Sequence, residues 1–155
     1  MERIPFTREG YEALRKELEQ LKTVERPQNI KAIEVARAHG DLSENAEFHA
    51  AKERQAFIEG RVNELGYKLN SADIIDISKL SKDAVVFGCR ILLENLDTGE
   101  TTKYQLVGPD ESNIEAGRIS VASPLGRALI GKKPGDEVVI QAPGGKREYE
   151  LIDIV

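Results

Sequence analysis

Residues 40–48 read Gly-Asp-Leu-Ser-Glu-Asn-Ala-Glu-Phe, and the apolar residues on the two sides of this stretch mirror each other. Upstream, leucines recur at spacings of four and then three, and downstream the spacings are three and then four. The upstream residues are Leu14, Leu18 and Leu21, and the downstream ones are Val62, Leu65 and Leu69. Two heptad stripes reflected through one point, here between residues 41 and 42, predict an antiparallel helical hairpin.

The hairpin should consist of two long helical arms. We expect the first over about residues 8–39, with Thr7 as its N-cap, and the second over about residues 43–72. Because Pro27 lacks an amide donor, a kink or short break is expected at residues 25–27. The apolar stripe should then resume at Ile30 and Ile33.

Gln28 lies opposite Gln55 when the two arms are reflected onto each other. Two hypotheses stay open for this pair. Buried glutamines would fix the register of the arms by hydrogen bonding, at some cost in stability. Exposed glutamines beside the kink would need no such role.

After Ala72 the periodicity changes to that of short strands separated by turns. We expect turns at residues 97–99 and 143–145, and a short helix that Ser123 and Pro124 cap and that runs to Ile130. Strands are expected at residues 73–77, 85–96, 101–107, 119–122, 137–141 and 146–154. The fold class is therefore α+β, with a coiled-coil hairpin over residues 1–77, its acidic tip at 40–48, and a small, mostly antiparallel β domain over residues 78–155.

Composition restricts the surroundings and the partners. The net charge of −5, from 22 basic and 27 acidic residues, argues against binding nucleic acid through bulk electrostatics, so such contacts must be local or arranged by a partner. The single cysteine, Cys89, excludes a disulfide framework and fits a buried position in a reducing compartment. With no apolar run near the roughly 18 residues of a membrane span, we expect a cytoplasmic protein with no membrane partner. A hairpin that buries its own stripe predicts a monomer.

Two acidic residues of the tip, Asp41 and Glu44, are three positions apart. On spacing alone, two hypotheses remain open. The pair forms a capping box at the start of the second helix, with Asp41 as N-cap, or it supplies oxygen ligands to a metal. Magnesium takes about six oxygens and is usually held by one or two carboxylates with waters and phosphates, so these two acids could only complete a site that a partner provides.

Other chemistry finds little support in the sequence. Glu47 either extends the acidic cluster or is a solvated helix residue, and His39 and His49 lack a partner at zinc-binding spacing. Arg37 and Lys52 lie near the tip on the two arms and are candidates for phosphate contact. Gly131 and Lys132 do not form a phosphate loop, and Ser123 has no evident catalytic partner.

The tip and the segment after it, His49-Ala50-Ala51-Lys52-Glu53, resemble the bacterial GreA/GreB transcript cleavage factors, and residues 49–52 resemble the GreA branch. The resemblance covers essentially the whole chain. It also includes Ile4-Pro5, Thr7, Arg26-Pro27, Val86-Phe87-Gly88, residues 120–132 and Pro143-Gly144-Gly145.

This resemblance implies an FKBP-like fold for the β domain, which would dock at the rim of the secondary channel of bacterial RNA polymerase while the hairpin enters the channel. Asp41 and Glu44 match the tip acids of the family, which help to hold a second, shared Mg²⁺ at the polymerase active site. Water then hydrolyses the backtracked RNA 3′ end. The factor would thus be auxiliary and not itself an enzyme.

The resemblance also implies roles for further residues. Arg37 and Lys52 would form a basic spot that faces the nascent RNA. Phe48 stands where the family commonly has Tyr, so an apolar contact is expected of it. The loop that docks on the polymerase would contain Ser123, Pro124, Leu125, Gly126 and Arg127.

Three alternatives remain. A paralogue of the same family would bind the same channel and inhibit the polymerase, because one fold can host opposite functions. A prolyl isomerase would need an aromatic-lined pocket, for which the β domain offers Phe87, Tyr104 and Tyr149. A structural coiled-coil adaptor would use the tip only as a cap.

Overall fold

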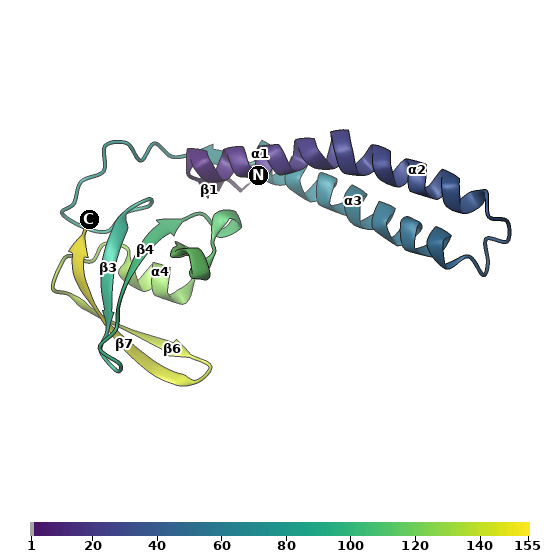
Figure 1. The fold of residues 1–155 in the computed structure, drawn as a ribbon. Coiled ribbons are helices and arrows are strands. Elements are labelled where there is room, and N and C mark those ends of the chain that lie inside the picture. The colour runs from purple at the N-terminus through teal and green to yellow at the C-terminus, as the bar shows by residue number, and fades with distance from the viewer. Residues whose placement is uncertain (1) are drawn as a thin grey trace. The chain divides into compact units, whose positions relative to one another are not determined.

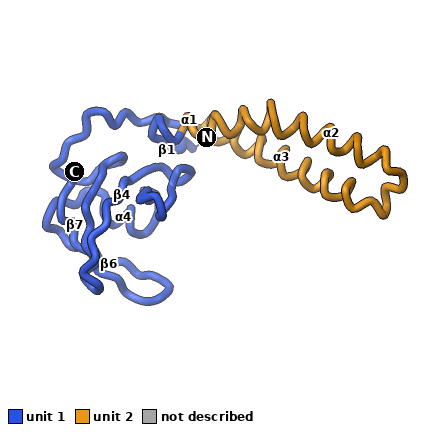
Figure 2. Tube along the Cα trace, viewed as in Figure 1, with its two compact units in different colours: residues 1–10, 72–155 blue, residues 11–71 orange. Residues whose placement is uncertain are grey.

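The computed structural model describes residues 2–155, which form two compact units (Figure 2). The hairpin unit is Tyr11–Ser71, and the β unit combines residues 2–10 with Ala72–Val155. This division differs from the expected boundary between residues 77 and 78. The reason is a short parallel ladder in which β1 (Ile4–Phe6) pairs with β2 (Ala72–Ile74). The sequence did not predict β1, because three residues are too few to show a strand period.

The hairpin unit has one continuous arm and one interrupted arm (Figure 1). α1 (Arg8–Gln20) and α2 (Arg26–Arg37) form the first arm, and α3 (Ala46–Asn70) forms the second. Apolar side chains of both arms are buried, among them Leu14, Leu21, Ile33, Ile58, Val62 and Leu65. The predicted hairpin is confirmed. Its first arm ends at Arg37, two residues before the expected end at residue 39, and its second arm begins at Ala46, three residues after the expected start at residue 43.

A π-helical turn, Leu21–Glu25, interrupts the first arm directly before the proline. The amide of Arg26 donates to the carbonyl of Leu21, five residues back. Such a turn takes in one extra residue, so the buried stripe moves to Asn29, Ile33 and Ala36. The expected break is confirmed, but the expected burial of Ile30 is wrong, because its side chain is 48% exposed.

A buried asparagine lies where the shifted stripe passes the turn. Asn29 is 8% exposed, and its Nδ2 donates to the carbonyl of Ala51 at 3.0 Å. Gln28 is exposed and Gln55 accepts from Lys52 Nζ at 2.9 Å, so the hypothesis of a buried glutamine pair is wrong. A buried amide is costly without a partner, so the Asn29 bond favours this one register of the arms.

The β unit is built on a five-stranded sheet of order β5-β4-β3-β7-β6. Its strands are β3 (Arg90–Asn95), β4 (Thr101–Val107), β5 (Arg118–Ser120), β6 (Glu137–Ala142) and β7 (Gly145–Ile154). Only the β4–β5 pairing is parallel among these ladders, which confirms a mostly antiparallel sheet. β3 begins later than expected, because Gly88 turns the chain with a φ of +87°.

One α-helix and two short 3₁₀ turns complete the β unit. α4 (Pro124–Leu129) is capped by Ser123, as predicted, and the 3₁₀ turns are Pro109–Glu111 and Ile114–Ala116. Leu129 of α4 joins a buried cluster with residues of all five strands, among them Ile91, Leu106, Ile119, Val138 and Leu151. Cys89 is free and buried, as expected. Within residues 2–155, no helix is both long and apolar enough to cross a membrane.

The shifted stripe can be tested with two isoleucines three residues apart. We expect Ile33→Ala to lower the free energy of unfolding by about 2–4 kcal/mol, because it removes a buried side chain and leaves a cavity. Ile30→Ala should cost less than about 1 kcal/mol, because half of that side chain is already in water. Urea denaturation followed by circular dichroism at 222 nm measures both. Equal losses would contradict the register shift at the π-turn.

Candidate functional site

The tip loop connects α2 to α3 and is held by a turn around Asp41. Gly40 reverses the chain with a φ of +103°. Asp41 Oδ1 then accepts two hydrogen bonds from Ser43, one from the hydroxyl at 2.8 Å and one from the amide at 3.0 Å. Both hydrogen bonds lower the pKa of Asp41 below its usual range, and the bond from the hydroxyl is the larger cause. Asp41 is therefore ionised at neutral pH and its orientation is fixed by its own loop.

Asn45, and not Asp41, caps α3. Its Oδ1 accepts from the amide of Phe48 at 3.1 Å, and its Nδ2 donates to the carbonyl of Ala36 at 2.6 Å. This one side chain satisfies the start of α3 and the end of α2. The capping-box hypothesis for Asp41 and Glu44 is thus wrong. The sequence does not single out Asn45 as the cap, because residues 41, 43 and 45 are all of types that cap well.

The tip leaves carboxylate oxygens without partners. Among residues 2–155, nothing hydrogen-bonds or ion-pairs with Glu44 or with Asp41 Oδ2. Both side chains are exposed. The described residues also contain no group of three or more His, Cys, Asp or Glu that could hold a metal ion. Two hard oxygen donors fit magnesium chemically, but they form only part of a coordination shell.

The candidate basic residues flank the tip on different arms. Arg37 is the last residue of α2 and is exposed, and its guanidinium group has no hydrogen-bond or ion-pair partner in the described chain. Lys52 lies in the second turn of α3, is exposed, and donates to Gln55. Both ammonium and guanidinium groups therefore face solvent, where phosphate could reach them.

The remaining tip residues make local contacts. His49 Nε2 lies 3.2 Å from the carbonyl of Ser43, and His39 Nε2 lies 3.8 Å from a Glu47 carboxylate oxygen. Phe48 is half-buried and meets the His49 ring edge-on, with 5.9 Å between ring centroids. None of these contacts involves the carboxylate of Asp41 or of Glu44.

The candidate docking loop leads into α4. Ser123 Oγ donates to the carbonyl of Ser120 at 2.6 Å and accepts from the amide of Gly126 at 3.0 Å. A Cβ on Gly126 would overlap with the Ser120 carbonyl, and Leu125 packs against the core. Pro124 and Arg127 are exposed. Of the five predicted residues, these two are therefore presented to solvent and the other three shape the loop.

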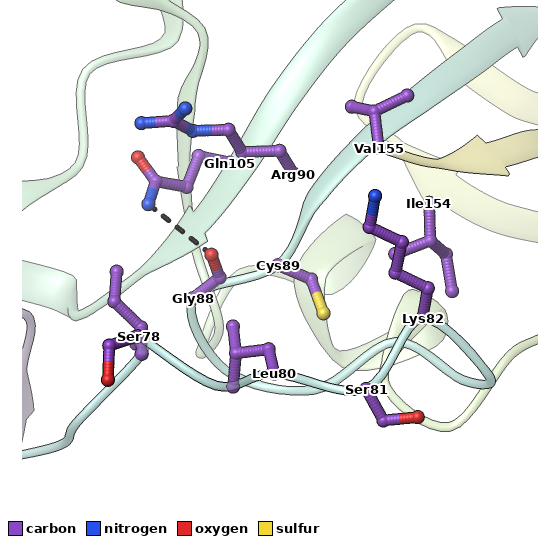
Figure 3. Close-up of a pocket in the computed structure, with 11 residues that line it drawn as sticks. Ser78, Leu80, Ser81, Lys82, Gly88, Cys89, Arg90, Gln105, Ile154 and Val155 are labelled. Carbon is purple, nitrogen blue, oxygen red and sulfur yellow. Dashed lines mark hydrogen bonds between the residues drawn. The ribbon is translucent and has the colours of Figure 1, made fainter.

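A pocket of about 330 Å³ lies beside the start of β3 (Figure 3). Lys82 and Arg90 line it together with small and aliphatic residues, and Gln105 Nε2 donates to the Gly88 carbonyl at 3.3 Å. No aromatic side chain belongs to its lining. This pocket therefore lacks the aromatic cradle that the prolyl isomerase hypothesis requires.

Comparison with known proteins gives one family for both parts of the chain. Residues 4–74 match the family described as transcription elongation factor, N-terminal, and residues 80–155 match transcription elongation factor, GreA/GreB, C-term. Two curated proteins named transcription elongation factor GreA, from Syntrophus aciditrophicus and Hyphomonas neptunium, are each 56% identical to the chain. The alignments cover 99% and 100% of this chain and 96% and 99% of those proteins. A solved structure, Gfh1 of Thermus aquaticus, is 32% identical, covers 99% of both chains and gives a TM-score of 0.45.

The fold and the tip define a two-part protein, in which a helical hairpin carries two exposed acids at its tip and a separate β unit carries a shaped loop. The matches over nearly the whole length show that this chain belongs to the GreA/GreB family of transcription elongation factors. The resemblance found in the sequence is thereby confirmed, as is a function in transcription elongation. The roles assigned to the individual tip and loop residues stay predictions.

The turn at the tip makes a pH prediction. Because hydrogen bonds favour the ionised form, Asp41 should titrate below the ordinary value of about 3.9. The stability that the turn contributes is present above that ordinary value and is lost as the pH falls through the lowered pKa. Ser43→Ala removes the larger cause and should raise the pKa of Asp41, as measured by NMR of the carboxyl carbon.

Asp76 provides an internal control, because Ser78 gives it the same two hydrogen bonds and its pKa is lowered for the same cause. Ser78→Ala should raise the pKa of Asp76 and leave Asp41 unchanged. An unchanged Asp41 in the Ser43→Ala variant would show that the turn does not form in solution.

Proposed function

We propose that this chain is an auxiliary transcript cleavage factor, which binds bacterial RNA polymerase and stimulates the polymerase's own hydrolysis of backtracked RNA 3′ ends. The observation that carries the proposal is the state of the two tip acids. Asp41 and Glu44 cap no helix, and they keep carboxylate oxygens free of partners within the described residues. Unpaired acids at the end of a helical hairpin suit a site that another protein completes.

In this proposal the two carboxylates help to hold a Mg²⁺ ion that the polymerase shares. Two metal ions that clamp the attacking and leaving oxygens are a common arrangement for phosphodiester cleavage. Asp41 presents Oδ2, because Ser43 occupies Oδ1 and fixes the turn. Glu44 approaches from the same loop with a free carboxylate. The chain then acts as a ligand donor, and the polymerase supplies the remaining ligands and the substrate.

The other candidate residues support this arrangement. Arg37 and Lys52 would contact phosphates of the nascent RNA 3′ end, because both are exposed cations near the tip. Pro124 and Arg127 would make the contact with polymerase, because they are the exposed residues of a loop that Ser123 and Gly126 hold in shape. The structural-adaptor hypothesis explained the tip acids as a helix cap, and that explanation is not needed because Asn45 caps α3.

The two acids can be tested by substitutions that keep their shape. Asp41→Asn retains the Oδ1 acceptor for Ser43, and Glu44→Gln retains the side-chain length. We expect each to reduce cleavage in stalled, backtracked transcription complexes on the order of 100-fold, the size typical of losing a transition-state charge contact. Binding to polymerase should not change. Cleavage rates at saturating factor and several Mg²⁺ concentrations give the measurement.

Glu47→Gln is the matched control, because Glu47 is also an acid of this region but lies inside the first turn of α3. It should cleave as the wild type does. If all three variants were equally defective, the result would contradict a specific metal-binding role and would indicate that only the overall negative charge of the tip matters. If the wild type bound without accelerating cleavage, the inhibitor hypothesis would take over.

The docking loop makes a separate prediction. We expect Arg127→Ala to weaken binding to polymerase several-fold, in the range of about 1 kcal/mol for an exposed charge at an interface. Lys133→Ala changes another exposed cation just beyond α4 and should leave binding unchanged. Fluorescence anisotropy with labelled factor measures both affinities. Equal affinities of the two variants for polymerase would contradict a docking role for this loop.

A further inference from the structure

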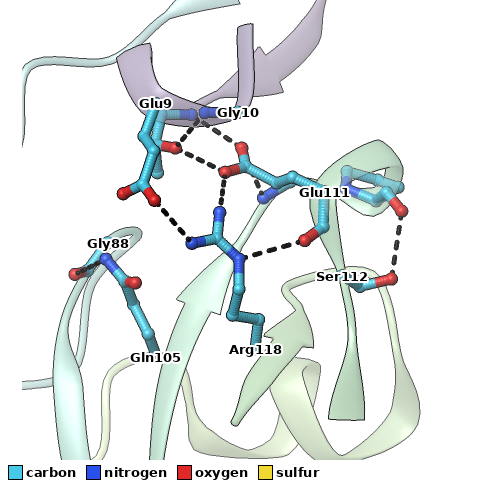
Figure 4. A network of polar contacts seen from close by, with 10 residues as sticks. Glu9, Gly10, Gly88, Gln105, Glu111, Ser112 and Arg118 are labelled. Atoms are coloured by element: carbon cyan, nitrogen blue, oxygen red, sulfur yellow. Dashed lines mark hydrogen bonds and ion pairs between the residues drawn. The ribbon is translucent and has the colours of Figure 1, made fainter. Parts of the chain in front are cut away.

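A largely buried acid, Glu111, makes an ion pair in the β unit (Figure 4). The Glu111 side chain is only 3% exposed. Its carboxylate accepts from the Thr7 amide at 2.7 Å, from the Thr7 hydroxyl, and from Arg118 Nη2 at 2.6 Å. Arg118 Nη1 in turn lies 3.7 Å from Glu9. The network therefore joins the first turn of α1 to the 3₁₀ turn that follows β4.

This arrangement is a capping box completed by a distant residue. Thr7 is the N-cap of α1, and its Oγ1 accepts from the amide of Gly10 at 3.1 Å. In a local capping box, a Glu at the position of Gly10 would accept from the Thr7 amide. Here Glu111, 104 positions away, accepts that bond.

The missing side chain at Gly10 is part of the same feature. A Cβ built on Gly10 would lie less than 3.0 Å from three atoms of the Glu111 carboxyl group. Gly108 is crowded in the same way, because its Cβ would overlap with the carbonyl of Pro5. Two glycines therefore make room for the close approach of residues 5–10 to residues 108–111. A local cap would have been simpler, so the distant one requires a reason.

We infer that Glu111 is a positioning residue, which anchors the start of α1 to the β unit so that docking of the β unit is transmitted to the tip acids. α1 begins in the β unit with residues 8–10 and continues as the first arm of the hairpin. An arm that pivoted freely at its first turn would spread the tip over many positions, and small misplacements are costly to catalysis. This inference rests on the proposed cleavage function.

Two variants separate anchoring from simple helix capping. Glu111→Ala removes both the anchor and the cap contact. The double variant Gly10→Gln/Glu111→Ala restores a local capping box, Thr7 with Gln at position 10. Its neutral amide does not replace the ion pair between Glu111 and Arg118, so the anchor is not restored. Glu111→Gln keeps an acceptor for Thr7 and tests the role if the alanine variant folds poorly. Glu115→Ala is the matched control, because Glu115 is an exposed acid in the next 3₁₀ turn.

The first measurement is a distance distribution from pulsed electron paramagnetic resonance, with spin labels at Glu53→Cys in α3 and Thr98→Cys in the β3–β4 turn. The native Cys89 is buried and does not compete for the label. We expect the distribution to broaden in Glu111→Ala and in the double variant, to broaden less in Glu111→Gln, and to stay narrow in Glu115→Ala.

The second measurement is cleavage of backtracked RNA at saturating factor. Glu111→Ala and the double variant should cleave at least about tenfold more slowly, with unchanged affinity for polymerase, although the double variant regains the thermal stability of the wild type. A double variant with a narrow distribution and full cleavage would overturn the inference, because capping alone would then suffice. If the wild type did not stimulate cleavage, the proposed function would fail, and the distance distributions would still decide whether Glu111 anchors α1.

Discussion

The apolar seam between the two helical arms is the constraint on which the hairpin depends. α3 buries Ala51, Ile58, Val62 and Leu65, which lie at heptad spacing. The first arm matches it only by taking in an extra residue at the π-turn Leu21–Glu25, which places Asn29 and Ile33 in the seam. Beyond the seam the helix ends have no neighbours to satisfy them, so side chains must do so. The acidic loop therefore lies at the end of the hairpin, beyond the last buried apolar residues of the two arms.

Most of the fold could be predicted because its signals are local and repeated. Heptad spacing over two long arms predicts the hairpin, and glycine-containing turns at residues 97–99 and 143–145 predict the strand pairs. The shifted stripe could not be predicted, because Ile30 is a better core residue than Asn29 by composition alone. Only the π-turn makes Asn29 the buried one, and its five residues have no distinctive pattern. β1 could not be predicted either, because it has only three residues and its partner strand, β2, is distant in the sequence.

The candidate site shows the same limit. Its acids stand out in the sequence, but their chemistry depended on which of three cap-forming residues begins α3. Asn45 does so because its amide also reaches the carbonyl of Ala36 across the loop, at 2.6 Å. Asp41 can reach no such second partner, and it bonds Ser43 within its own turn. A tertiary hydrogen bond thus decided between a capping role and a free carboxylate, and no local spacing rule contains that information.

The two helix starts of the first and second arms differ in what they depend on. The cap of α3 involves only residues 36–48 around the tip, so it forms with the hairpin itself. The cap of α1 includes Glu111, whose position exists only once the β unit has folded. Closing so long a loop costs chain entropy, and packing of the β unit's own core must offset that cost. The cap at the tip therefore forms without the β unit, whereas the start of α1 depends on a residue of the β unit. Substitutions at the tip act on the carboxylates themselves, and substitutions at the start of α1 act on how those carboxylates are positioned.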